Sequence, residues 1–362
     1  MSLTVDRAAL DRAVNFAIRA VPRHPQAPVL SGLLLDAKDG DLTVTGYDFD
    51  TATEGTIDAA GTLEALVPGA ALRHYVGGMR GDQVRLTDTG RAVEITCGSA
   101  TVALPKLDLS SSPRRPEVPE AMGTVDTETL ARAFAAARVC VDPDSPKPGI
   151  QGIRLEFTDA HIVVAGLHHE RAVERVVEWQ GSAAPLMLAP VAAADVLKGW
   201  GAETTIAADM YTLALSDAHH LVTLRLLDAS DTPDHRLYFD QCKGDCRITV
   251  DQEELVDAVK FVAVGDTRTH LTVDVGTDSL ILSDEGERGS SRLGIAAKVE
   301  GEVVQTGWKA ENLLRAASVL AGPALTMQLG PRFRSPGLFT SDDDPACRYV
   351  AMPVDLSKKP KR

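Results

Sequence analysis

"TVDRAALDRAV", residues 4–14, occurs three times in this chain with small changes. The second copy, "TVDTETLARAF", begins at Thr124, and the third, "TVDQEELVDAV", begins at Thr249. Each copy has Thr-Val-Asp, a Leu six positions after the Thr and an Ala nine positions after it. The copies lie 120 and 125 residues apart. Self-similarity at a period of one domain length indicates an internal triplication.

Each copy reads as a short strand followed by a helix. The Asp that ends the strand is a good helix N-cap, and it stands at Asp6, Asp126 and Asp251. In the first copy Leu10, Val14 and Ala17 recur at helical spacing and predict a buried stripe, with Arg12 and Arg19 on another face.

The elements that follow also repeat. Alternating apolar residues around a turn with Asp or Gly predict a strand pair, which occurs at 33–48, 153–169 and 271–286. A second helix is predicted at 68–79, 189–200 and 309–320, and more strands close each repeat. We therefore expect an α+β protein of three similar domains, each with two helices and antiparallel sheets.

Two stretches rich in Ser, Pro and Asp predict linkers, at 108–121 and 228–245. They divide the chain into expected domains at 1–117, 118–240 and 241–356, and a basic tail, "SKKPKR", occupies 357–362. The length of 362 residues suits two or three domains, and the repeat favours three.

The composition describes a soluble globular protein, with 44% hydrophobic and 24% charged residues. No apolar run reaches the length of a membrane span, and the N-terminus lacks the apolar region of a signal peptide. Five irregularly spaced Cys argue against a disulfide framework, so we expect a cytoplasmic protein. The net charge of −14 argues against a chain that coats nucleic acid with its whole surface, but it allows a local basic face.

Several stretches resemble the bacterial DNA polymerase III β subunit, the sliding clamp. They are the repeated "TVD" segments, "HPQAPVLSGLLLDAKDGDLTVTGYD" (24–48), "VPGAALRHYVGGM" (67–79), "LLDASDTPDHR" (226–236) and the C-terminal "YVAMPVDL" (349–356). The resemblance covers residues 1–356. It implies a non-catalytic processivity factor of DNA replication, without a cofactor, in which two chains close head-to-tail into a ring of six similar domains around duplex DNA. It also implies the polymerase α subunit, the clamp loader and other clamp-binding proteins as partners, in the cytoplasm at the nucleoid.

A ring held on DNA by topology needs only a modest basic lining, because phosphate contacts carry no sequence information. The candidates for this lining are Arg7, Arg12, Arg23, His24, Arg73, Arg132, Arg138, Lys147, Lys198, Lys260, Lys309 and Arg315. Ala70 and Ala71, and Val191 and Ala192, stand where the family has basic residues. For dimer closure we expect the edge strand that carries Val102 and Leu104 to meet the third domain of the partner near Val264.

Family clamps bind short peptides in a pocket between the second and third domains, and this pocket is rewritten here. The family segment Thr-Asp-x-(His or Tyr)-Arg-(Leu or Phe) corresponds to residues 166–171, where Glu170 replaces an Arg and Arg171 an apolar residue. Leu237 stands at a position that is often Arg. We therefore expect a rim that repels acidic peptide residues, with Arg171 narrowing the entrance. The expected pocket comprises Ile150, Gly166, His168, His169, Glu170, Arg171, Pro233, Leu237, Tyr238, Val350, Met352, Pro353, Val354 and Leu356.

Three readings of the function stay open at the sequence level. The chain is the main replicative clamp, or a specialised second clamp whose pocket resists a clamp-directed inhibitor, which the pocket changes favour. Alternatively, it is a clamp-fold peptide-binding regulator that no longer loads on DNA, as the sparse lining suggests. A metal site at His168 and His169 is disfavoured because neighbouring strand residues point to opposite faces, and Cys242 and Cys246 lack a second ligand pair. No catalytic signature is present.

Overall fold

The computed structural model describes residues 1–264, 266–286, 289–302, 305–330 and 335–356. The predicted basic tail, 357–362, lies outside these residues. Within the described ranges no helix is long and apolar enough to span a membrane.

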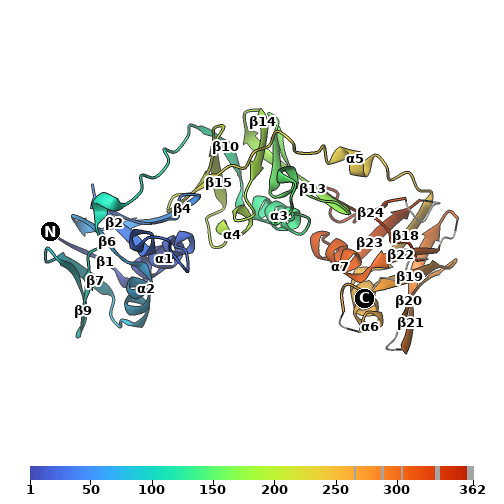
Figure 1. The fold of residues 1–362 in the computed structure, drawn as a ribbon, viewed down its shortest axis with the longest axis horizontal. Coiled ribbons are helices and arrows are strands. Elements are labelled where there is room, and N and C mark those ends of the chain that lie inside the picture. Colours follow the sequence, from blue (N-terminus) through green and yellow to red (C-terminus); the bar gives the residue numbers. More distant parts are fainter. Residues whose placement is uncertain (265, 287–288, 303–304, 331–334, 357–362) are drawn as a thin grey trace. The chain divides into compact units, whose positions relative to one another are not determined.

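The same order of elements occurs three times (Figure 1). The first repeat contains β1 (Ser2–Asp6), α1 (Arg7–Ala17), β2 (Gly32–Lys38), β3 (Asp41–Tyr47), β4 (Thr51–Asp58), β5 (Ala60–Gly61), β6 (Leu63–Pro68), α2 (Gly69–Gly78), β7 (Gln83–Asp88), β8 (Ala92–Cys97) and β9 (Ala100–Pro105). The second contains β10 (Ala121–Asp126), α3 (Thr127–Arg138), β11 (Ile153–Phe157), β12 (His161–His168), β13 (Arg171–Gly181), β14 (Ala184–Ala189), α4 (Ala193–Val196), β15 (Glu203–Ala208), β16 (Thr212–Ser216) and β17 (His220–Arg225). The third contains β18 (Cys246–Asp251), α6 (Gln252–Val262), β19 (His270–Val275), β20 (Ser279–Gly286), β21 (Gly289–Glu300), β22 (Gln305–Lys309), α7 (Ala310–Val319), β23 (Ala324–Leu329), β24 (Gly337–Thr340) and β25 (Cys347–Ala351). Apart from β5 and the short linker helix α5 (Arg236–Phe239), each element has a counterpart in the other repeats, which confirms the predicted α+β class.

The first helix of each repeat begins as the sequence predicts. The Asp6 carboxylate accepts a hydrogen bond from Ala9 N at 2.8 Å, and the Asp251 carboxylate accepts one from Glu254 N at 2.9 Å. These bonds satisfy backbone N–H groups that the first helical turn leaves unpaired.

The second helix of the middle repeat is much shorter than predicted. The pattern indicated a helix over 189–200, but α4 has only four residues. At the start of α4, backbone N–H groups donate hydrogen bonds to the carbonyl three residues earlier, for example Ala193 N to Pro190 O at 3.0 Å. No side chain caps the start of the helix. Gly199 then takes a positive φ of 87°, which ends the turn.

The chain divides into two compact units, which are described separately. The first comprises residues 1–127 and 198–226, and the second comprises 128–197 and 227 onward. The division passes through the middle repeat, so the domain boundaries expected from the linkers stay a prediction.

Each unit contains one sheet that runs from one repeat into the next. In the first unit the sheet has the order β6-β2-β3-β4-β17-β16-β15-β10. In the second unit the order β14-β11-β12-β13-β25-β24-β23-β18-β21 joins the middle repeat to the third. We call the antiparallel β4–β17 pairing the first junction and the β13–β25 pairing the second junction.

A buried glycine fixes how closely the first helix packs on the sheet in two repeats. A Cβ at Gly46 would lie 2.1 Å from Ala17 O, and a Cβ at Gly166 would lie 1.9 Å from Ala137 O. Any larger residue would separate helix from strand. The two glycines lie 120 residues apart, as do the two alanines, so the packing repeats with the sequence.

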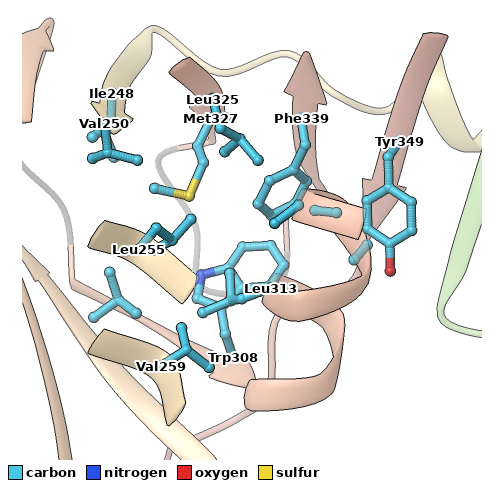
Figure 2. Close-up of a cluster of buried hydrophobic side chains, with 14 of the residues drawn as sticks. Ile248, Val250, Leu255, Val259, Trp308, Leu313, Leu325, Met327, Phe339 and Tyr349 are labelled. Atoms are coloured by element: carbon cyan, nitrogen blue, oxygen red, sulfur yellow. The ribbon is translucent and has the colours of Figure 1, made fainter. Parts of the chain in front are cut away.

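The core of the third repeat packs around Trp308 (Figure 2). Trp308 and Tyr349 both contact Phe339 edge-on, with ring centroids 5.3 and 5.7 Å from it. Leu255 and Val259 of α6 and Leu313 of α7 cover this aromatic group. The apolar faces of α6 and α7 therefore close this core, and the stripe predicted for the first copy, Leu10, Val14 and Ala17, is buried as well.

Candidate functional site

The second junction brings most of the expected pocket residues together. His169 and Glu170 form the turn between β12 and β13, and Met352 N donates a hydrogen bond to Glu170 O at 2.7 Å. Tyr238, from the linker, packs against Ile150 on one side and Val350 on the other. The turn, the linker and the C-terminal segment thus meet at the second junction.

The C-terminal segment is held along β22. Val354 N donates to Gly307 O at 2.8 Å. A Cβ at Gly307 would lie 2.7 Å from Leu356 Cδ2, so the leucine side chain covers this glycine. Met352, Pro353 and Val354 are half-buried and Leu356 is 38% exposed, which leaves apolar surface accessible beside the junction.

The remaining pocket candidates differ in accessibility. Pro233, Leu237 and His169 are exposed, and His168 is half-buried. Gly166 is buried, and the space beside its Cα is occupied by the backbone of α3, so its role is in packing.

Glu170 forms an ion pair with Lys309. Lys309 Nζ lies 2.5 Å from Glu170 Oε2, and the Glu170 side chain is 39% exposed. Burial opposes ionisation of the carboxyl and is the largest single effect. The hydrogen bond and charge of Lys309, with smaller contributions from His168 and Arg171, together outweigh it and lower the pKa of Glu170 below its ordinary value. Lys309 therefore balances the charge of Glu170, and the expectation that the rim repels acidic peptide residues stays a prediction. Lys309 is likewise engaged at the junction and is not a free cation for DNA.

Arg171 does not narrow the entrance of a pocket. It is 6% exposed, and its Nη1 lies 4.0 Å from Glu311 Oε1 of α7. Alternation along β13 explains this placement, because Ala172 packs with the linker residue Phe239 and its neighbour Arg171 points to the other face. The prediction that Arg171 lies at the rim is wrong.

A charged network fixes the second linker over the junction. Arg154 is 7% exposed, donates to Glu156 at 2.7 Å and donates to the carbonyl of Pro233 at 3.0 Å. Arg236 also pairs with Glu156. His235 is fully buried, and its Nε2 lies 2.8 Å from Glu174 Oε2. Burial opposes ionisation of Glu174, but His235 and Arg348 outweigh it and lower the pKa of this carboxyl.

The sequence interpretation missed Arg154 and His235. The repeat spacing could have indicated His235, because its counterpart Arg115 is also basic and the counterpart of Glu174 is Glu54. It could not have indicated Arg154, whose counterpart is Leu34.

The candidate DNA-facing residues fall into two groups. Arg7 is half-buried and donates to Gly81 O, and Arg315 is half-buried, donates to Val139 O and pairs with Glu311. Together with Lys309 these side chains are engaged in structural contacts. The exposed candidates are Arg12, Arg23, His24, Arg73, Arg132, Arg138, Lys147, Lys198 and Lys260. Of these, Arg138 pairs with Asp195, Arg73 donates to Asn15, and Arg132 Nη2 lies 4.0 Å from Asp344 Oδ1.

The dimer candidates lie at a strand edge and a helix end. β9 pairs with β8 on one side, and no other described strand covers its outer edge. Val102 is half-buried on this strand, while Leu104 is 3% exposed and belongs to the core of its own repeat. Val264 follows α6 and is 64% exposed.

The two adjacent histidines do not lie as expected. His169 lies in the turn and not on the strand, and the two rings are 5.6 Å apart, so the prediction of opposite faces is wrong. Within the described ranges, no group of three or more His, Cys, Asp or Glu side chains could hold a metal ion. All five cysteines are free thiols.

Comparisons with known proteins agree on one family. Residues 1–116 match the family model of the DNA polymerase III beta subunit, N-terminal domain. The beta sliding clamp of Streptomyces coelicolor is 28% identical over 383 residues, covering 99% of this chain and 100% of that protein. Over its whole length the chain is therefore similar to beta sliding clamps, and its first 116 residues match the N-terminal domain of that family.

Other matches extend along the whole chain. The beta sliding clamp homolog GriR of Streptomyces muensis is 25% identical, covering 98% of this chain and 99% of that protein. Among solved structures, the Pseudomonas aeruginosa clamp bound to griselimycin aligns with a TM-score of 0.92 at 19% identity, covering 98% of this chain and all of that one. The sliding-clamp fold thus extends over all three repeats.

Proposed function

We propose that two copies of this clamp close head-to-tail into a ring around duplex DNA and hold the replicative polymerase on it. The observation that carries the proposal is the repeated junction. At each junction within the chain, the fourth strand of one repeat (β4 or β13) pairs with the last strand of the next (β17 or β25). Among the strands that the structure describes, the fourth strand of the last repeat, β21, and the last strand of the first repeat, β9, are left for the same pairing between copies.

Hydrogen bonds fix which residues of β21 are equivalent to β4. Thr53 Oγ1 donates to the carbonyl of Ala17, the last residue of α1, at 2.8 Å. Ser291 Oγ donates to the carbonyl of Val262, the last residue of α6, at 3.0 Å. Ser291 therefore takes the place of Thr53, and Arg292 that of Glu54.

The hairpins fix the equivalence of β9 and β17. Thr101 lies opposite Thr96, and Leu221 lies opposite Ser216, each pair displaced by 120 residues from the other. At the first junction Thr53 is opposite Val222 and Glu54 is opposite Leu221. By analogy we propose that Ser291 of one copy lies opposite Val102 of its partner, and Arg292 opposite Thr101.

Two exposed arginines support a basic inner face. Arg12 on α1 and Arg132 on α3 hold equivalent helix positions 120 residues apart, whereas the third repeat has the exposed Asp257 there. The proposed lining is therefore uneven, and sliding rests on ring topology with few phosphate contacts. The proposed partners are duplex DNA, the polymerase III α subunit, the clamp loader and other clamp-binding proteins, in the cytoplasm at the nucleoid.

Loading on nicked circular DNA tests this function. With a loader, the wild type should stay on the circle and leave when the DNA is linearised. Arg12→Glu with Arg132→Glu should lose loading while the dimer persists, because two phosphate-facing charges are reversed. As a matched control, Asp257→Asn changes the equivalent position of the third repeat and should load normally. A wild type that dimerises but never loads would favour the clamp-fold regulator instead.

The rewritten second junction supports a specialised role. Glu170 and Leu237 stand where the family has basic residues, and the Glu170–Lys309 pair binds the turn to β22. We propose that this pocket resists a clamp-directed inhibitor. A clamp of this fold is known to bind such a compound, since the Pseudomonas aeruginosa structure contains griselimycin.

Calorimetry with griselimycin tests the specialised role. The wild type should bind it more weakly than the Pseudomonas aeruginosa clamp does. Glu170→Arg with Leu237→Arg should recover part of the affinity, and Glu170→Gln, which removes the charge without adding a cation, is the matched control. Tight binding of griselimycin by the wild type would contradict the specialised role and favour an ordinary replicative clamp.

A further inference from the structure

The first junction repeats the geometry of the second in detail. Arg225 N donates to Asp50 O at 2.8 Å, as Met352 N donates to Glu170 O at 2.7 Å. Asp50 precedes Glu170 by 120 residues. The turn before β4 is therefore joined to the end of β17 as the turn before β13 is joined to the segment after β25.

A groove of about 580 Å³ lies at the first junction, on the side where the first linker crosses it. Four of its lining residues, Leu30, Tyr47, Pro113 and Val118, precede Ile150, Leu167, Pro233 and Tyr238 by 120 residues. The groove is thus the counterpart of the region around the expected peptide pocket.

Smaller side chains leave this groove open. At the second junction Tyr238 packs against the cluster of Ile150 and Leu167, while its counterpart Val118 is 51% exposed. The counterpart of the buried Arg154, which ties down the second linker, is Leu34, an apolar half-buried residue. The first groove therefore has an accessible apolar floor.

The charge at the edge of the groove is positive. Arg114 is exposed and makes no ion pair with any residue that the structure describes, whereas its counterpart at the second junction is Asp234. Arg115 pairs with Glu54 and also donates to Thr45 Oγ1. An apolar floor beside an unpaired guanidinium suits an apolar side chain next to a carboxylate.

An exposed aromatic residue extends this surface. Phe49, the counterpart of His169, is 57% exposed and has a φ of 79°. Its ring lies 5.9 Å from that of the groove residue Tyr47, whose hydroxyl donates to Phe49 O. A non-glycine residue at positive φ stores strain, which is typical of ligand-contacting segments.

We propose that this first-junction groove binds a short linear peptide segment that presents an apolar side chain beside an acidic residue. The proposal rests on the proposed clamp function and adds a second peptide site to the same protein. The exposed residue at the edge is Arg114 here and Asp234 at the second junction. The chain's own tail, with Lys358, Lys359, Lys361 and Arg362, has the wrong charge for this groove.

The test is a fluorescence titration of the full-length protein with labelled acetyl-Gly-Asp-Leu-Phe-Gly amide. Arg114→Asp should weaken binding about fivefold, since it turns one exposed attraction into repulsion. Val118→Tyr should weaken binding about tenfold. The change introduces the residue found at the second junction, Tyr238, and its ring would cover the apolar floor of the groove. Both positions are exposed, so neither change threatens folding. Leu237→Asp reports on the pocket at the second junction. Arg247→Asp, at an exposed arginine on β18 that belongs to neither site, is the matched control and should leave the affinity unchanged.

Three results would overturn the proposal. The first is binding that does not saturate at millimolar peptide. The second is loss of binding in Leu237→Asp while Arg114→Asp and Val118→Tyr bind normally. The third is equal affinity for a probe that has Lys in place of Asp. The titration needs no DNA, so its failure is distinguishable from failure of the wild type to load on circular DNA.

Discussion

Replacing Asp344 by Asn should weaken the second junction strongly. Asp344 and Arg175 are each about 4% exposed in their side chains, and the guanidinium donates to both carboxylate oxygens, at 2.8 and 2.5 Å. Arg175 also donates to Val319 O at 3.2 Å, and Ala321 N donates to Asp344 at 3.0 Å. The pair therefore connects β13 of the middle repeat to the third.

The magnitude follows from burial. Removing one partner of a buried ion pair costs about 3–5 kcal/mol, because the other charge stays buried without compensation. Asn keeps one acceptor oxygen, so we expect the lower end, about 3 kcal/mol. Replacing both partners, Arg175→Met with Asp344→Leu, should cost about 1 kcal/mol or less, since no buried charge remains.

Hydrogen exchange at the amides of β25 measures this opening energy directly. A loss of about 3 kcal/mol corresponds to roughly a hundredfold faster exchange. Asp343→Asn, an exposed neighbour, is the matched control and should exchange like the wild type. The reasoning would be refuted if Asp344→Asn changed the exchange rate of the β25 amides less than fivefold, or if the double replacement accelerated exchange as much as Asp344→Asn does.

The same pair predicts a pH dependence. Burial opposes ionisation of Asp344, but Arg175 and the Ala321 amide outweigh it and lower the pKa of this carboxyl. A carboxyl whose pKa is lower in the folded state than in the unfolded state stabilises the fold at pH values above its unfolded-state pKa, which is about 3.9. This stability is lost as the pH falls through the folded-state pKa. The difference between wild type and Asp344→Asn should therefore be full at pH 7 and shrink in acid below about pH 4.

Three further predictions concern other features. In a denaturant titration, Gly166→Ala should lower the free energy of unfolding by at least about 2 kcal/mol, because the new Cβ would collide with Ala137 O. Gly78→Ala is the control and should be neutral or stabilising, because the space around Gly78 is open. Glu170→Gln should cost less than about 1 kcal/mol at pH 7, since the pair with Lys309 is partly exposed, and a larger loss in thermal unfolding would contradict that reading. Burial raises the pKa of Cys140 and Cys347 to about 12, so iodoacetamide should leave both unmodified in the folded protein at pH 8, and mass spectrometry showing rapid alkylation would count against their burial.

The repeated segments at Thr4, Thr124 and Thr249 were enough to predict the order of elements, because Asp caps and helical stripes act locally. The length of α4 could not be predicted, since an alanine-rich stretch favours a helix whether or not a cap supports it. The site was harder still. Glu170 and Arg171 are adjacent in sequence, but one pairs with Lys309 and the other points to α7, and only the register of β13 separates them. No sequence motif indicates the groove at the first junction. It is recognised only when residues 120 positions apart are compared in the structure.

Disulfide formation between Arg292→Cys and Thr101→Cys tests ring closure most directly. Both positions are exposed, and four of the five native thiols are buried. In a head-to-tail ring each junction should form one cross-link, and the oxidised protein should stay on circular DNA in high salt until the DNA is cut. A partner displaced by two residues, Ala103→Cys with Arg292→Cys, should cross-link poorly, because antiparallel partners two residues apart are farther from each other. Efficient cross-linking in the predicted pair with retention on the circle is the expected result. A protein that stays monomeric, or that cross-links equally well in both registers, would contradict the proposed ring.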